Sequence, residues 1–156
     1  MKATIVQLAD DVVEQLNKKQ GGWSIPFAAE RKYQPKVKLE DTDQLNVTVA
    51  IAAWRPSPDN RTDWANEYEI HIGFQYRAGP KAGDQATEKF DEVLRLVEQV
   101  SDYWEVTRPE LADCPLKEIA FGGGGDQPYS PEHIEQYNQI TSVIRLTFWK
   151  LRDPDA

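Results

Sequence analysis

Three residues that could do chemistry, Glu67, Glu69 and His71, stand two positions apart along one stretch of the chain. In an extended strand this spacing places all three side chains on one face. Two carboxylates and an imidazole could bind a divalent metal ion there or act as an acid–base pair. Large apolar residues alternate with them, so we expect the polar face to meet water or a neighbouring subunit. No HExxH or HxH motif accompanies them, and we predict no metal, no cofactor and no catalytic residue.

Three further features could be functional, and each has a simpler interpretation. A glycine run at 122–125 is followed by Asp-Gln-Pro and not by the Gly-Lys-Ser/Thr of a phosphate-binding loop, which favours a connecting loop. Asp113 beside Cys114 would raise the pKa of the thiol, which favours an inert cysteine. His133 stands close to two glutamates and is expected at the surface. We therefore predict that the chain is not an enzyme, with a small metal-dependent enzyme built around His71 as the less favoured alternative.

The composition is that of one globular domain spanning residues 1–156. Apolar residues make up 40% and charged residues 28% of the chain, which is ordinary for such a domain. The formal net charge of −8 argues against nucleic-acid binding by phosphate neutralisation. One cysteine excludes an intrachain disulfide. No apolar run approaches the roughly 20 residues of a membrane helix, and acidic residues come too early for a signal peptide. We expect an intracellular protein with no membrane partner.

The polar row lies in the second strand of a predicted β-hairpin. Residues 45–51 and 68–76 alternate apolar with small or polar side chains, which is the pattern of half-buried strands. Between them, residues 55–65 are rich in turn formers and include Pro56 and Pro58, which cannot donate to a strand ladder. The sequence therefore predicts two long strands joined by a long, exposed loop.

Apolar periodicity and helix or strand breakers predict the remaining elements. They are an amphipathic helix at 3–18, an edge strand at 23–33, a long helix at 85–105, a short strand at 116–121, a helical turn opening at 130, and a strand at 139–150. Residues 152–156 form a frayed acidic tail. This order predicts a single α+β domain, with a mainly antiparallel sheet, a long hairpin, and helices packed on one face.

Five tryptophans in a small domain point to contact with other proteins. Trp54 and Trp64 flank the predicted hairpin loop, which carries charges of both signs. A partly buried tryptophan is common in any domain, so a structural role for these rings stays open. The candidate subunit or partner interface has six residues: Trp54, Arg55, Asp59, Arg61, Asp63 and Trp64.

The order of elements and several short motifs resemble one family of proteins. Residues 27–35 read Phe-Ala-Ala-Glu-Arg-Lys-Tyr-Gln-Pro, and residues 39–49 form a Leu- and Asp-rich turn that leads into a strand. A loop with Asp-Asn-Arg at 59–61 precedes the long strand, the long helix and a last strand ending Leu-Thr-Phe at 146–148. This pattern is similar to the neck and tail-completion proteins of long-tailed bacteriophages, most closely the tail terminators. The resemblance leaves residues 108–134 without a counterpart.

The resemblance implies a structural virion protein without catalytic residues. Tail terminators form hexameric rings that cap the tail tube, stop its polymerisation and provide the surface that joins the head. The implied partners are further copies of the chain, the phage tail tube protein and a neck or head-completion protein, while DNA passes through the bore without specific binding. The loop at 55–66 and the glycine run would contact the adjoining ring or tube. The implied location is the virion tail or neck, and the host cytoplasm during assembly. A head-completion or stopper protein of the same neck is the alternative.

Overall fold

The computed structural model describes residues 2–18, 22–33, 44–58, 64–78, 85–122, 127–137 and 139–151. These residues form helices and a five-stranded sheet, which confirms the predicted α+β class. The helices within these ranges lack the long, uncharged apolar stretch that crossing a bilayer requires. In chain order the elements are α1 (Thr4–Lys18), β1 (Ala29–Arg31), β2 (Asn46–Pro58), β3 (Trp64–Arg77), α2 (Gln85–Thr107), β4 (Leu116–Phe121), α3 (Pro131–Tyr137) and β5 (Gln139–Leu151).

The sheet has the strand order β1-β2-β3-β5-β4. β2 with β3, β3 with β5, and β5 with β4 pair antiparallel, while the short β1 runs parallel to β2. α2 connects β3 to β4 and leaves a place between these two strands, which β5 fills at the end of the chain. The sheet is therefore mainly antiparallel, as the alternating strand patterns predict.

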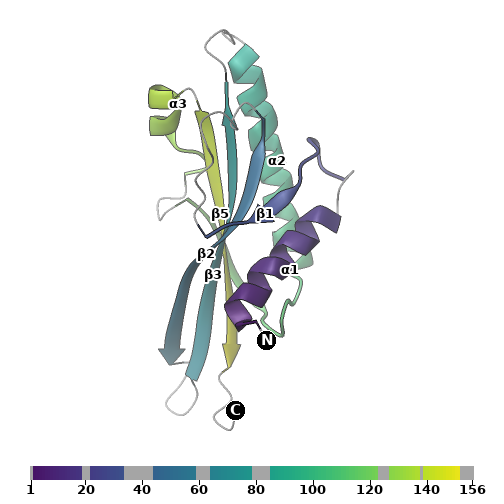
Figure 1. The fold of residues 1–156 in the computed structure, drawn as a ribbon, viewed down its shortest axis with the longest axis vertical. Coiled ribbons are helices and arrows are strands. Elements are labelled where there is room, and N and C mark those ends of the chain that lie inside the picture. The colour runs from purple at the N-terminus through teal and green to yellow at the C-terminus, as the bar shows by residue number, and fades with distance from the viewer. Residues whose placement is uncertain are drawn as a thin grey trace.

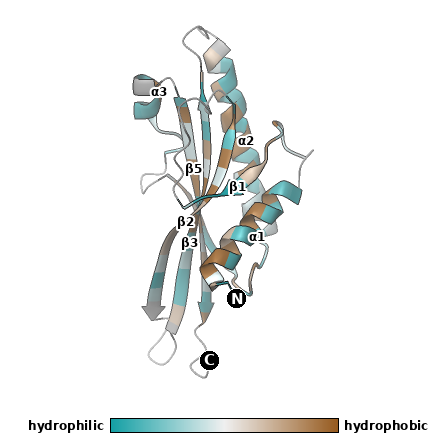
Figure 2. Ribbon diagram, viewed as in Figure 1, coloured by the Kyte–Doolittle hydropathy of each residue, from teal (hydrophilic) through white to brown (hydrophobic). Residues whose placement is uncertain are grey.

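Alternation along β3 decides which face of the sheet is buried. Tyr68, Ile70, Ile72 and Phe74 are each 3% exposed or less, and α1 and α2 pack over them. Figure 1 shows both long helices on the same side of the sheet. In Figure 2 the hydrophobic residues of α1, coloured brown, gather on its side toward the strands. The two long helices thus pack on one face, as predicted.

An aromatic cluster packs α2 against the segment that follows α1. The Tyr103 hydroxyl of α2 donates to Gln15 Oε1 of α1 at 2.8 Å, and the Tyr103 ring meets the Trp104 ring edge-on with 5.4 Å between centroids. The Trp23 ring packs against Tyr103 and Phe27, and its Nε1 donates to a carbonyl in the last turn of α1. Trp104 is fully buried, and its Nε1 has no hydrogen-bond partner among the described residues. The rings therefore pack α2 against the segment that follows α1, and the hydrogen bond from Tyr103 to Gln15 links the two helices directly.

β1 is shorter than the strand predicted at 23–33 and covers only Ala29–Arg31, although its edge position is as predicted. The Asn17 side chain of α1 brackets Ala29. Asn17 Nδ2 donates to Ala29 O at 3.2 Å, and Asn17 Oδ1 accepts from Ala29 N at 2.8 Å. These bonds satisfy backbone groups that a further strand would otherwise pair with. The helix therefore takes the place of a neighbouring strand at this edge.

The hairpin strands are longer than predicted, and the prediction that the loop begins at residue 55 is wrong. β2 continues to Pro58 and β3 begins at Trp64, so Pro56 and Pro58 lie within a strand. A proline fits an edge strand when the side that lacks the N–H faces away from the paired strand. β1 pairs only with residues 47–49 of β2, and no other strand among the described residues pairs with the rest of this edge, where both prolines fit.

α3 lies apart from the two long helices. It follows Ser130 and begins at Pro131, at the predicted helix start. Figure 1 shows it across the sheet from α2, beside one end of β5. Its His133 contacts Thr141 of β5, which stands between the buried residues Ile140 and Ser142 and so lies on the face away from the core.

Truncating the centre of the core tests this arrangement. Ile72 is 0% exposed on the strand that α1 and α2 cover. We expect Ile72→Ala to lower the free energy of unfolding by roughly 2–5 kcal/mol, because the cavity adds to the lost burial. Denaturant melts measure this loss. Val106→Ala, at an 84% exposed position of α2, is the control and should change stability by less than about 0.5 kcal/mol. Equal stability of the two variants would contradict the burial of this face.

Candidate interaction site

The sheet extends past its helices at the end where β2 finishes and β3 begins. Figure 1 shows the lower ends of β2, β3 and β5 continuing beyond α1. Trp54 is 58% exposed there, whereas Tyr68, directly opposite it in the register, is 3% exposed. The two ring centroids are 5.9 Å apart. The buried Tyr68 therefore lies at the limit of the face that the helices cover, and the Trp54 ring beside it is exposed.

The structure places two of the six predicted interface side chains. Trp54 and Arg55 are neighbours in β2, so they project to opposite faces of the sheet. Trp64 pairs through its backbone with Pro58, but its side chain is outside the described part of the chain. Three further residues are also outside it: Asp59, Arg61 and Asp63. The six-residue interface therefore stays a prediction, in which Trp54 is an exposed aromatic residue that the structure describes.

Glu69 is the centre of a charge network on the face opposite to α1 and α2. Its side chain is 11% exposed, and Arg55 Nη1 lies 3.2 Å from Oε2. His71 Nε2 lies 2.8 Å from Oε1, and Arg145 Nη1 lies 3.8 Å from the same oxygen. Burial acts to raise the pKa of Glu69, but the hydrogen bonds to His71 and Arg55 outweigh it and lower the pKa. Glu69 is therefore a carboxylate with its charge compensated by neighbouring strands.

Glu67 repeats this arrangement nearer the end of the hairpin. Arg55 Nη2 lies 3.8 Å from Glu67 Oε2, and Lys117 reaches Glu67 Oε1 from β4. Arg55 thus bridges both glutamates, and the ion pairs link strands β2, β3, β4 and β5. The sequence pointed to the two glutamates and His71, but the cations come from other strands and could only be found once the register was known.

The row of Glu67, Glu69 and His71 does share one face, as predicted. Its carboxylates contact cationic side chains rather than one another. Among the residues that the structure describes, no group of three or more histidine, cysteine, aspartate or glutamate side chains is arranged to bind a metal. The geometry therefore assigns this row to cross-strand ion pairing.

Cys114 is buried away from the charge network. It is 0% exposed, and its thiol donates to Ala112 O at 3.3 Å. Burial raises the pKa of the thiol, and Asp113 raises it further. A neutral, inaccessible thiol agrees with the prediction of an inert cysteine.

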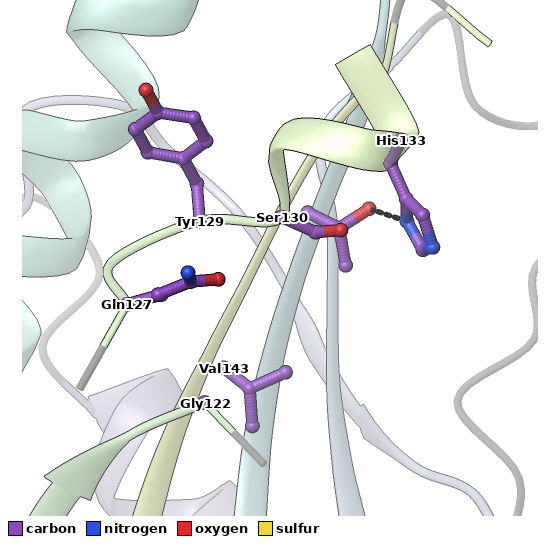
Figure 3. A pocket seen from close by; sticks show the side chains of 7 residues that line it. Gly122, Gln127, Tyr129, Ser130, His133 and Val143 are labelled. Atoms are coloured by element: carbon purple, nitrogen blue, oxygen red, sulfur yellow. Dashed lines mark hydrogen bonds between the residues drawn. The ribbon is translucent and has the colours of Figure 1, made fainter. Parts of the chain in front are cut away.

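A shallow cavity of about 310 Å³ lies between α3 and the end of β5. In Figure 3 the dashed line marks the hydrogen bond of His133, while the Tyr129 ring points away from it. His133 Nδ1 lies 2.8 Å from Thr141 Oγ1, and Ser130 N donates to Thr141 O at 2.9 Å. His133 is half-buried rather than a plain surface residue, and it fixes α3 against β5.

Comparison with known proteins adds little to this geometry. No protein-family model matches the chain, and no curated protein matches it. One solved structure, of a protein that carries no functional name, aligns with 98% of this chain and 97% of its own at 12% sequence identity. Its TM-score is 0.42, and likeness at that level carries no argument about function.

The charge network predicts a specific dependence of stability on pH. The pKa of Glu69 is lowered in the folded chain, so its ion pairs stabilise the fold above its unfolded pKa of about 4.5. The contribution is lost as pH falls through the lower, folded pKa. We expect Glu69→Gln to cost roughly 1–3 kcal/mol near neutral pH, and the difference from wild type to shrink below about pH 4. Urea melts at pH 7 and pH 3 measure both effects.

The matched control is Glu118→Gln on the same face. Glu118 is an exposed residue of β4 and lies opposite Thr147 in the register. This variant should stay within about 0.5 kcal/mol of wild type at both pH values. A loss of stability for Glu69→Gln that is the same at pH 7 and pH 3 would contradict the proposed ionisation of Glu69.

Proposed function

We propose that the chain is a subunit of a ring that closes the tail tube of a long-tailed bacteriophage, in the role of a tail terminator. The ring caps the tube, stops its polymerisation and presents a surface to the neck protein on the head side. Such a role depends on shape and contact and requires no catalytic residue. The observation that carries the proposal is the hairpin end of the sheet, where the exposed Trp54 extends the aromatic core past the helix layer.

The surroundings of Trp54 suit it to an interface. Tyr68 packs beside its ring, and Arg55 is held on the other face by Glu67 and Glu69. A strand end that is already ordered loses little conformational entropy on docking, and tryptophans are prominent among residues that dominate binding energy. Subunits of a ring join head to tail through two different, complementary patches. Trp54 anchors one of these patches in our proposal.

The net charge influences both assembly and the bore of the ring. Each subunit carries −8, so copies in a ring repel one another at low ionic strength. Screening shortens the reach of this repulsion to about 8 Å at physiological salt and further above it, and association should strengthen as salt rises. A negatively charged bore would let DNA pass without being held, because phosphates find few cations to bind.

Removing the indole tests the role of the hairpin end. Trp54→Ala should fold normally, because Trp54 is more than half exposed, and should weaken subunit association at least tenfold, as expected of a hot-spot residue. Native mass spectrometry and sedimentation across a salt series measure association. Complementation of a phage that lacks its own copy, followed by measurement of tail lengths, tests function.

Tyr33→Ala is the control, because Tyr33 is a 71% exposed aromatic residue outside the hairpin strands. It should leave ring formation and tail length unchanged. Rings and tails of normal length with Trp54→Ala would refute the role of the hairpin end. A wild-type chain that stays monomeric at every salt concentration, both alone and with isolated tail tubes, would refute the ring itself.

A further inference from the structure

The two edges of the sheet differ in their capacity to pair with another strand. On the β2 side, Pro56 and Pro58 lack the N–H groups that an added strand would need. At the other end of the same edge, the Asn17 side chain already occupies the backbone groups of Ala29. On the β4 side, residues 116–121 contain no proline. Among the described residues, the β4 edge therefore keeps donors of the kind that the prolines remove from the hairpin end of β2.

The register identifies the free backbone groups of β4. Gly122 N donates to Val143 O at 2.9 Å, and the preceding residue, Phe121, lies opposite Ile144. In an antiparallel pair, alternate residues direct both N–H and C=O toward the partner strand. Ala120 therefore bonds to β5, whereas Ile119 and Phe121 direct their N–H and C=O groups outward. Among the described residues no strand lies on that side of β4.

A groove lies between α2, Pro128 and Phe121 at the end of this edge. It has a volume of about 360 Å³, and its apolar part includes Leu94 and Val97 of α2 and Phe121 of β4. Two acidic residues of α2, Glu98 and Asp102, line it as well, and both are exposed. The groove therefore combines four outward backbone groups, an apolar surface and a negative rim.

We propose that the β4 edge and this groove bind an extended segment of another protein by strand addition. A segment paired with Ile119 and Phe121 directs every second side chain toward α2. One of these side chains is large and apolar and contacts Leu94 and Val97. The next, two residues along, is lysine or arginine, whose aliphatic stem lies on the apolar surface while its charge meets Glu98 and Asp102.

The charges and edges of the chain favour a different protein over a second copy as the occupant. Pairing of β4 with β4 of a second copy would bring two acidic groove rims together, which costs free energy through like-charge repulsion. The free half of β2 in a second copy lacks donors at Pro56 and Pro58. A basic segment is also attracted to a chain with a net charge of −8. This surface lies at the sheet edge opposite to β1 and does not depend on the proposed ring.

The test uses a synthetic peptide in which leucine and lysine stand two positions apart among threonines, Thr-Val-Thr-Leu-Thr-Lys-Thr, with blocked ends. Fluorescence anisotropy measures its binding to the full chain, and amide hydrogen exchange by NMR locates it. We expect exchange at the amides of Ile119 and Phe121 to slow at least tenfold with saturating peptide. Exchange at Ala120 should change little, because its amide already bonds to β5.

Charge-reversed partners provide the controls. The double variant Glu98→Lys, Asp102→Lys should bind the peptide at least tenfold more weakly, whereas Glu92→Lys, an exposed residue of the same helix outside the groove, should bind as wild type does. A peptide with glutamate in place of lysine should bind at least tenfold more weakly to the wild type. The proposal is overturned if the lysine and glutamate peptides bind equally well, or if no binding is seen at millimolar peptide. It is also overturned if the peptide slows exchange only at amides outside β4. If the amides of Ile119 and Phe121 already exchange slowly without peptide, and this protection is lost when the protein is diluted, a second copy of the chain occupies the edge. That result would also overturn the proposal.

Discussion

The packing of one face of β3 against α1 and α2 is the contact on which the rest of this structure depends. β3 pairs with a strand on each side, so its register fixes β2 and β5 as well. A shift by one residue would turn Glu67 and Glu69 toward the helices and Ile70 and Ile72 toward solvent. The cost of burying two carboxylates in an apolar layer excludes that alternative. The apolar face and the charge network on the other face therefore specify the same register independently.

The long elements could be predicted from the sequence because their periodicity is a local property. The helices at 4–18 and 85–107 and the strands of the hairpin carry apolar residues at the spacing of their own geometry. The extent of β2 could not be predicted, since Pro56 signals a turn unless the strand is known to lie at an edge. The way the β1 edge is covered was equally hidden, because it depends on the side chain of Asn17, which comes from the preceding helix.

The candidate site was predictable only in part, for a related reason. The exposure of Trp54 follows from where the helix layer ends, and that limit is set by α1 packing in three dimensions. The row of Glu67, Glu69 and His71 was visible in the sequence, but its meaning depended on cations from other strands. Arg145 comes from the last strand of the chain and reaches Glu69 because β5 pairs beside β3. The residue types in this row suggested metal binding or acid–base chemistry, whereas the strand register places them beside cations with which they form ion pairs.

The contrast between the two tryptophans has a spectroscopic consequence. The indole of Trp104 is fully buried and its N–H has no hydrogen-bond partner among the described residues, whereas the indole of Trp54 is mostly in water. Indole emission moves to shorter wavelength in apolar surroundings, so these two rings emit at opposite ends of the tryptophan range. Loss of the core would shift Trp104 emission to the red, and docking of the hairpin end would shift Trp54 emission to the blue. Variants that keep only Trp104 or only Trp54 of the five tryptophans would thus report unfolding and association separately.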